Sequence, residues 1–358
     1  MKHGAPVSGL GLLRQRLFAT PLDVAITLAC AGILWFTAVP LLKWMLFNAT
    51  ITGASRSDCA PGGACWVLIR ARFDQYMYGF YPAGERWRVN AAGLLLALGI
   101  AIASWKAMPL RGPMLAAAIF GFPVLGVWLL YGGLGLPVVE TRVWGGLMLT
   151  VFMSVYGGLL AVPLGILLAL GRQSELPIIR TLSVIFIEFW RGVPIIAVIF
   201  LASLLIPLIM PSGIGVDRLA RAVIGLGFVI AAYMAEAVRG GLQAIPQGQR
   251  EAAAALGLGY WPTMRLIVLP QALRISLPAI TNEFISLVKN TTLVLVVSIF
   301  DLLGIAQAAI TDPNWAGLNK ESYIFAGAIY WIVCFALSRW SRALERRQDD
   351  RALKPSAG

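Results

Sequence analysis

The sequence has few charged residues for its length. Asp, Glu, Lys and Arg make up only 13% of its 358 residues, about half the share found in a soluble domain. Hydrophobic residues make up 59%, and the mean hydropathy is +0.78. The apolar residues fall in repeated runs of about 20, the length at which a helix crosses a bilayer. We therefore expect an all-α, polytopic transmembrane helical bundle embedded in the lipid bilayer.

Histidine is almost absent and cysteine is scarce. The single histidine, His3, lies in the N-terminal tail, so Ser-His-Asp, Cys-His and multi-histidine metal sites are excluded. The carboxylates and cysteines show no metal-binding spacing, and we expect no metal, no catalytic residue and no enzyme activity. Cys59 and Cys65 share one polar loop. A turn at residues 61–63 can bring them into disulfide range, and only an oxidising compartment would keep that bond.

The sequence also lacks a phosphate-binding loop. Such a loop needs Gly-Lys followed by Ser or Thr, and none of the six lysines follows a glycine. We therefore expect no nucleotide site and no cofactor in this chain.

The positive charge is unevenly distributed between the loops. The net charge is +12, and cytoplasmic loops of membrane proteins carry excess Lys and Arg. With the N-terminus inside, seventeen of the 29 Lys and Arg residues fall on the inner side, nine on the outer side and three in spans. This bias predicts cytoplasmic termini and an even number of spans. No stretch outside the spans alternates basic with aromatic residues, so we expect no nucleic-acid partner.

The apolar runs predict about eight spans. We expect an N-terminal extension at 1–140, with three spans and an external loop at 48–88. A transmembrane core follows at 141–341, and a basic cytoplasmic tail at 342–358. The expected spans are Val24–Phe47, Val89–Trp105, Pro113–Tyr131, Val143–Leu170, Thr181–Met210, Leu219–Ala237, Leu273–Phe300 and Tyr323–Trp340.

A polar stretch, Pro246–Pro270, separates two of these spans. Its composition predicts a short helix over Gln247–Leu256 that begins after a proline and stops at a glycine. The stretch resembles the EAA loop of the permease subunits of binding-protein-dependent ABC importers. It matches every fixed position of that pattern, with Glu251-Ala252-Ala253, Gly257, Ile267 and Leu269-Pro270.

Further motifs narrow the resemblance to the polar amino-acid permeases, which have a five-span type I core. Tyr233, Glu236 and 239–241 lead into the loop as they do in that subfamily. The segment 189–194 resembles its Arg-Gly-Thr-Pro motif, with Val where Thr is usual, and 289–293 resembles its Lys-Asp-Thr-Ser-Leu motif. The three preceding spans resemble those of the M-type subunit of general L-amino-acid permeases.

This resemblance implies a function and a set of partners. The chain would be a permease of the bacterial inner membrane that passes amino acids from a periplasmic amino-acid-binding protein to the cytoplasm. An ABC ATPase subunit would hold ATP and Mg²⁺, and a second, related but non-identical permease would complete the importer. The expected ATPase-coupling residues are Glu251, Ala252, Ala253, Leu256, Gly257 and Tyr260.

Polar and ionisable residues inside predicted spans are costly and are therefore candidates for the substrate pathway. Lys289 or Arg191 would meet the carboxylate of an amino acid, and Glu283 or Glu236 its ammonium. Alternatively, these residues form ion pairs between helices, or lie near span ends. The i, i+3 spacing allows Glu188 to pair with Arg191. The candidates are Glu188, Arg191, Glu236, Glu283, Lys289 and Asn290.

Two other functions compete with this interpretation. Charges within the membrane and broken helices would also suit an ion-coupled secondary transporter of small polar solutes. The EAA loop and the lack of obvious inverted repeats favour the importer. A membrane-embedded enzyme has little support, because catalytic residue clusters are missing from the sequence.

Overall fold

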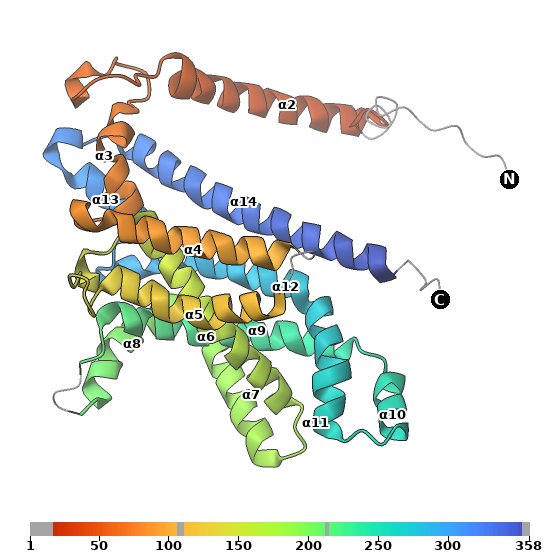
Figure 1. Ribbon diagram of the computed structural model, residues 1–358. Coiled ribbons are helices and arrows are strands. Elements are labelled where there is room, and N and C mark those ends of the chain that lie inside the picture. The colour runs from red at the N-terminus through yellow and green to blue at the C-terminus, as the bar shows by residue number, and fades with distance from the viewer. Residues whose placement is uncertain (1–16, 106–110, 212–214, 353–358) are drawn as a thin grey trace. The chain divides into compact units, whose positions relative to one another are not determined.

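The computed structural model describes residues 17–105, 111–211 and 215–352, and within these ranges the regular structure is helical (Figure 1). The helices are α2 (Pro21–Leu42), η1 (Lys43–Phe47), η2 (Arg56–Asp58), α3 (Val67–Tyr78), η3 (Ala83–Glu85), α4 (Arg86–Ser104), α5 (Arg111–Tyr131), η4 (Thr141–Val143), α6 (Gly146–Arg172), α7 (Pro177–Gly192), α8 (Ile195–Ile209), α9 (Arg218–Gln243), α10 (Gln247–Ala255), α11 (Tyr260–Thr263), η5 (Met264–Val268), α12 (Leu269–Asn290), η6 (Thr291–Val297), α13 (Leu302–Thr311), η7 (Pro313–Trp315) and α14 (Asn319–Ala352).

The number of apolar helices agrees with the sequence. In the described ranges, seven helical segments are long and apolar enough to cross a membrane, or eight if the bent pair α7 and α8 counts as one span. The prediction of an all-α bundle of about eight spans is thus confirmed.

The chain divides into two compact units. One comprises Met1–Arg72 and Ile310–Ser322, and the other Phe73–Ala309 and Tyr323–Gly358. The unit boundaries differ from the domain boundary expected near residue 140, which stays a prediction.

The first unit contains α2 and a polar loop closed by several contacts. Thr20 and Asp23 form a capping box at the start of α2. In the loop, Cys59 and Cys65 are joined in a disulfide. The carboxylate of Asp58 accepts hydrogen bonds from two backbone N–H groups, which lower its pKa from the usual value.

Two side-chain contacts hold this loop and the start of α3 against the segment Ile310–Ser322 of the same unit. The backbone N–H of Cys65 donates to the buried carboxylate of Glu321 over 3.0 Å. Arg72 forms an ion pair with Asp312. These contacts give the first unit its own closed structure.

The second unit is organised around α9, against which α6, α7, α8 and α12 all pack. Small residues let these backbones approach closely, as is usual between membrane helices. A Cβ added at Gly165 of α6 would lie 2.6 Å from Cβ of Met234 on α9. Nearer the end of α9, Gly241 faces Ala272 and Ser276 of α12, and the Ser276 hydroxyl donates to the Ala237 carbonyl over 2.9 Å.

The helices α4 and α5 pack side by side in the same unit (Figure 1). Arg88 near the start of α4 is fully buried, although the sequence placed it in an external polar loop. Its guanidinium donates twice to the carbonyl of Pro137, at 3.0 and 2.9 Å, and pairs with Glu85 at 3.0 Å. Arg88 therefore anchors the segment that follows α5.

Two predicted spans are broken and one continues further than expected. The run Thr181–Met210 bends by 109° between α7 and α8, because Val193 and Pro194 adopt extended backbone angles. The α-helical part of the seventh span ends at Asn290. It continues as the 3₁₀ helix η6 and stops at Ser298, which has a φ of +58°. The last helix, α14, continues past the predicted span end at Trp340.

Substitution of two adjacent glycines of α9 tests the close packing of α9 against α12. Gly241→Ala should lower stability by about 1–3 kcal/mol, because the new methyl group overlaps the α12 backbone at Ala272 and the Ser276 hydroxyl. Gly240→Ala is the matched control, since a Cβ there meets no atom within 4 Å. Thermal unfolding midpoints in detergent would measure both. Equal midpoints for the two variants would contradict the packing described.

Candidate functional site

The polar stretch between α9 and α12 forms an exposed helix with a tight C-terminal turn. Gly257 has a φ of +75°, a conformation that favours glycine. The N–H of Gly257 donates to the Ala254 carbonyl over 2.9 Å, and the N–H of Leu258 to the Ala253 carbonyl over 3.0 Å. This pair of bonds is a Schellman motif, which satisfies carbonyls at the end of α10.

Residues 247–261 contain the coupling residues expected from the sequence and are named the coupling loop for that reason. Their side chains divide into two sets. Ala253 is buried and packs within the chain, although the sequence grouped it with the contact residues. Leu256 is 79% exposed, Tyr260 54% and Trp261 70%. Glu251, Ala252 and Gly257 are also exposed. The loop thus presents large apolar side chains at its tip, a pattern that marks an interaction surface.

Three of the predicted pathway residues meet in an ion-pair network at the coupling-loop end of α6 and α9. Arg172, the last residue of α6, donates to Glu188 of α7 and to Glu236 of α9, both over 2.9 Å. Glu236 also pairs with Arg239 at 2.7 Å and lies 3.9 Å from Arg191. One carboxylate therefore holds three arginines.

The partners in this network are not those predicted. The i, i+3 spacing of Glu188 and Arg191 predicts a pair on one helix face, but in the described structure Glu188 pairs with Arg172. The guanidinium of Arg191 lies instead over the ring of Tyr233, at 5.5 Å from its centroid. Tertiary packing of α6 against α7 decides the pairing. The i, i+3 spacing of Glu236 and Arg239 is a sequence signal that could have indicated one contact of this network.

The remaining candidates lie on α12, apart from the network's ion pairs. Asn290 donates to the Ser286 hydroxyl over 3.3 Å, so these two share a face as their spacing predicts. Glu283 is half-buried and Lys289 is exposed. Neither has an ion-pair partner in the described ranges. Both charges are therefore available to a ligand or to another chain.

A buried acidic residue was missed by the sequence reasoning. Asp301 lies between the spans that end at Val297 and begin at Asn319, and it is fully buried. Its carboxylate accepts hydrogen bonds from the Tyr330 hydroxyl at 2.6 Å, the Gly304 N–H at 2.9 Å and the Thr291 hydroxyl at 3.3 Å. Burial raises the pKa of Asp301 despite these donors. The position of Asp301 between two apolar segments is the sequence feature that could have identified it.

No group of three or more metal-ligating side chains occurs in the part of the chain that the structure describes. The side chains of the two clusters above are carboxylates, guanidiniums and hydroxyls, and several of their hydrogen bonds join one helix to another.

Comparison with known proteins identifies the family. The family model described as binding-protein-dependent transport system inner membrane component matches residues 161–350, more than half of the chain. The chain belongs to this family. The matched range of the permease includes the coupling loop, the ion-pair network and Asp301.

Two relatives extend the similarity over nearly the whole permease. YhdY of Escherichia coli K12, an inner membrane amino-acid ABC transporter permease protein, is 49% identical over 94% of this chain and 92% of its own length. BztC of Rhodobacter capsulatus, a glutamate/glutamine/aspartate/asparagine transport system permease protein, is 39% identical over 96% of this chain and 95% of its own. Both relatives therefore align with the N-terminal spans as well as with the core.

Among solved structures, the permease resembles a chain in the crystal structure of an amino acid ABC transporter with histidines. The TM-score is 0.51 and the identity 30%, over 56% of this chain and 92% of that one.

Replacement of Glu236 should lower the stability of the protein more than replacement of Glu188. Glu236→Gln leaves three guanidiniums without their shared carboxylate, whose side chain is only 18% exposed. We expect a loss of about 1–3 kcal/mol in stability. Glu188→Gln is the matched control. Its side chain is 55% exposed and has one partner, so the expected cost is below about 1 kcal/mol. Thermal unfolding in detergent would rank the two, and the reverse order would refute the network's role.

The raised pKa of Asp301 predicts a pH dependence of stability. A folded-state pKa above the unfolded value of about 3.9 contributes stability below that value, and the contribution is lost as pH rises through the folded pKa. Asp301→Asn removes this titration and keeps the shape of the side chain. The difference in unfolding midpoint, wild type minus Asp301→Asn, should therefore fall from acid to neutral pH. A constant or rising difference would show that the carboxyl does not have a raised pKa.

Proposed function

We propose that this chain is the transmembrane permease subunit of an ATP-driven amino-acid importer. It passes amino acids from a periplasmic binding protein to the cytoplasm, and a separate ABC ATPase drives it. The observation that carries the proposal is the coupling loop, an exposed EAA-type helix ended by Gly257. The amino-acid permeases YhdY and BztC support the choice of cargo.

The coupling loop would dock in a groove on the ATPase. Leu256 and Tyr260 would be the apolar contacts, with Trp261 beside them, because these large side chains are costly to leave in water. Glu251 and Ala252 would lie at the same interface, and Ala253 would support the helix from inside. ATP and Mg²⁺ would be bound by the ATPase alone, since this chain has no Gly-Lys sequence.

A bacterial inner membrane with both termini in the cytoplasm fits the distribution of basic residues. A second permease, related but not identical, would cover part of α12. Asn282 and Lys289 are exposed on that helix, and a charged residue facing lipid is expensive. A protein partner or a water-filled pathway at this face removes that cost.

The structure favours a particular division of roles among the pathway candidates. Glu236 is held by three arginines, so it and Arg191 would serve mainly to join the helices. Glu283 has no such partner and would meet the ammonium of an amino acid, with Asn290 on the same face. Lys289 would meet the carboxylate.

Substitution of Gly257 tests the coupling role in proteoliposomes that contain the complete importer and its binding protein. Gly257→Asp should lower ATP-driven amino-acid uptake severalfold, because it places a charged side chain at the tip of the loop and on a residue whose φ of +75° favours glycine. Gly259→Asp is the matched control. It adds the same charge two residues away, at a φ of −71° in the N-cap of α11, where Asp is favoured.

Uptake would be measured with and without ATP at a constant membrane potential, together with co-purification of the ATPase. Normal uptake and normal ATPase retention in Gly257→Asp would refute the coupling role. Wild-type uptake that needs an ion gradient and not ATP would favour a secondary transporter.

A further inference from the structure

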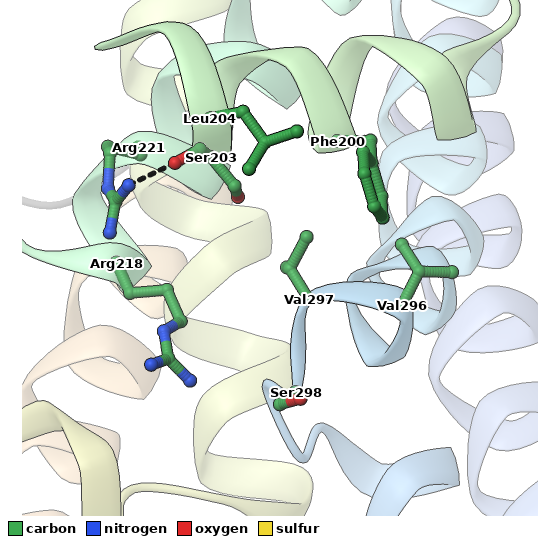
Figure 2. A pocket seen from close by; sticks show the side chains of 8 residues that line it. All are labelled: Phe200, Ser203, Leu204, Arg218, Arg221, Val296, Val297 and Ser298. Atoms are coloured by element: carbon green, nitrogen blue, oxygen red, sulfur yellow. Dashed lines mark hydrogen bonds between the residues drawn. The ribbon is translucent and has the colours of Figure 1, made fainter. Parts of the chain in front are cut away.

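A second polar site lies at the opposite end of α9 from the coupling loop. A cavity of about 350 Å³ opens between α8, the first turn of α9 and the turn that follows η6. Figure 2 shows the side chains of Arg218 and Arg221 on one side of it, with Phe200 and Val297 across from them. The volume is within the range of small-molecule sites.

The polar groups of this cavity have unused hydrogen-bonding capacity. Arg221 donates to the backbone carbonyl of Ser203 (Figure 2). The Nε of Arg221 and the hydroxyl of Ser203 are both shielded from solvent and have no hydrogen-bond partner. Arg218 is exposed, and it forms no ion pair or hydrogen bond with the described residues. Buried unpaired groups such as the Nε of Arg221 and the hydroxyl of Ser203 are rare in proteins, and each is costly.

Neither arginine forms an ion pair with an acidic side chain in the part of the chain that the structure describes. The cavity lining contains no Asp or Glu. Asp217 is adjacent in sequence, but one of its oxygens caps α9 by accepting the N–H groups of Leu219 and Ala220. The other accepts the Thr141 hydroxyl over 2.6 Å. An anion is therefore the ligand that these guanidiniums lack.

The walls favour an anion that carries an apolar or neutral part. Phe200, Leu204 and Val297 line the cavity opposite the charged groups. Guanidinium groups bind carboxylates through paired, charge-assisted hydrogen bonds. A small organic carboxylate satisfies both sides of the cavity at once, with its oxygens at the arginines and its remainder against the apolar wall.

The position of the cavity along α9 indicates the side of the membrane from which a ligand would reach it. Arg218 begins α9, whose 26 residues measure about 39 Å in an α-helix, and the coupling loop follows the other end. If that loop is cytoplasmic, as proposed above, the cavity is at the external end. It is also distinct from the network around Glu236 and from the polar face of α12.

We propose that this cavity is an external receiving site, in which Arg218 and Arg221 bind the carboxylate of the incoming amino acid. The proposal rests on the proposed function for the direction of transport. An anionic lipid headgroup has similar oxyanion chemistry and is the competing occupant. A free amino acid is favoured because two guanidiniums that have no carboxylate partner among the described residues lie beside an apolar wall.

Direct binding to the intact importer, without ATP or binding protein, tests the site. The probes are radiolabelled L-glutamine, L-leucine and L-arginine, each competed by the amine that lacks its α-carboxylate. Arg218→Gln should weaken binding of the amino acids about tenfold to a hundredfold. The amines should not compete. Arg142→Gln is the matched control, because it removes one exposed charge near Asp217 and does not line the cavity.

A second variant distinguishes a loss of ligand binding from a loss of folding. Ser203→Ala removes the unpaired hydroxyl without changing charge, and it should weaken binding while leaving the size-exclusion profile unchanged. Arg218→Lys should restore part of the affinity, since it keeps the charge and loses the paired geometry. Unchanged binding in Arg218→Gln, equal competition by the amines, or no binding by the wild type would each overturn the proposal.

Two further measurements show whether the occupant is an amino acid or a lipid, and separate failure of this site from failure of the proposed function. The measurement is repeated in phosphatidylcholine nanodiscs with and without phosphatidylglycerol. A phosphatidylglycerol effect on thermal stability that disappears in Arg218→Gln, with amino-acid binding unchanged, would assign the cavity to lipid and overturn the proposal. ATP-driven uptake by the wild type with unchanged binding in Arg218→Gln would refute this site alone. Arg218-dependent binding without any ATP-driven uptake would support the site and refute the proposed function.

Discussion

Close approach of α6, α9 and α12 through small residues is the constraint on which the second unit depends. In a bilayer the hydrophobic effect does not drive helices together, so van der Waals packing and hydrogen bonds must do so. Gly165 and Gly241 lie against neighbouring helices where a methyl group would overlap, and Gly227 meets the side chain of Leu160 in the same way. This packing fixes the rotation of α9 about its axis. As a result, Glu236 faces Arg172 near one end of the helix, and Arg221 reaches Ser203 of α8 near the other.

Much of the fold could be predicted from the sequence because hydropathy controls it. Each long apolar run became helical, most of them near the expected bounds, although the segment that contains the seventh run begins at Tyr260 rather than at Leu273. The coupling loop was also predictable, since Gly257 is the residue type that a left-handed helix end requires. The direction in which the chain continues within a predicted span was not predictable. Hydropathy does not distinguish a straight span from one bent by 109°, so Pro194 alone did not reveal that α8 turns away from α7. Ser298 adopts a positive φ that its residue type does not announce.

The candidate site was predicted in its residues and only partly in its contacts. A charged side chain inside a membrane is energetically costly without a partner, so the sequence identifies Glu188, Arg191 and Glu236 as residues that need partners. It does not show which residues those partners are. Arg172 seemed to mark only the end of a span, yet it joins two of the three. Asp301 was missed for a related reason. A charge between two apolar segments resembles a solvated turn, and only the tertiary structure shows that Tyr330 and Thr291 enclose it.

The distribution of proline indicates which helices can change shape during transport. Pro163 lies inside α6, Pro207 inside α8 and Pro278 inside α12, and each removes a backbone hydrogen bond. The 26 residues of α9 contain no proline, and they connect the Arg218 cavity to the coupling loop. A stiff helix transmits a displacement along its length without absorbing it. Movement of the coupling loop would then carry α9 as one body, and the cavity would open or close because α8 and η6 shift against it.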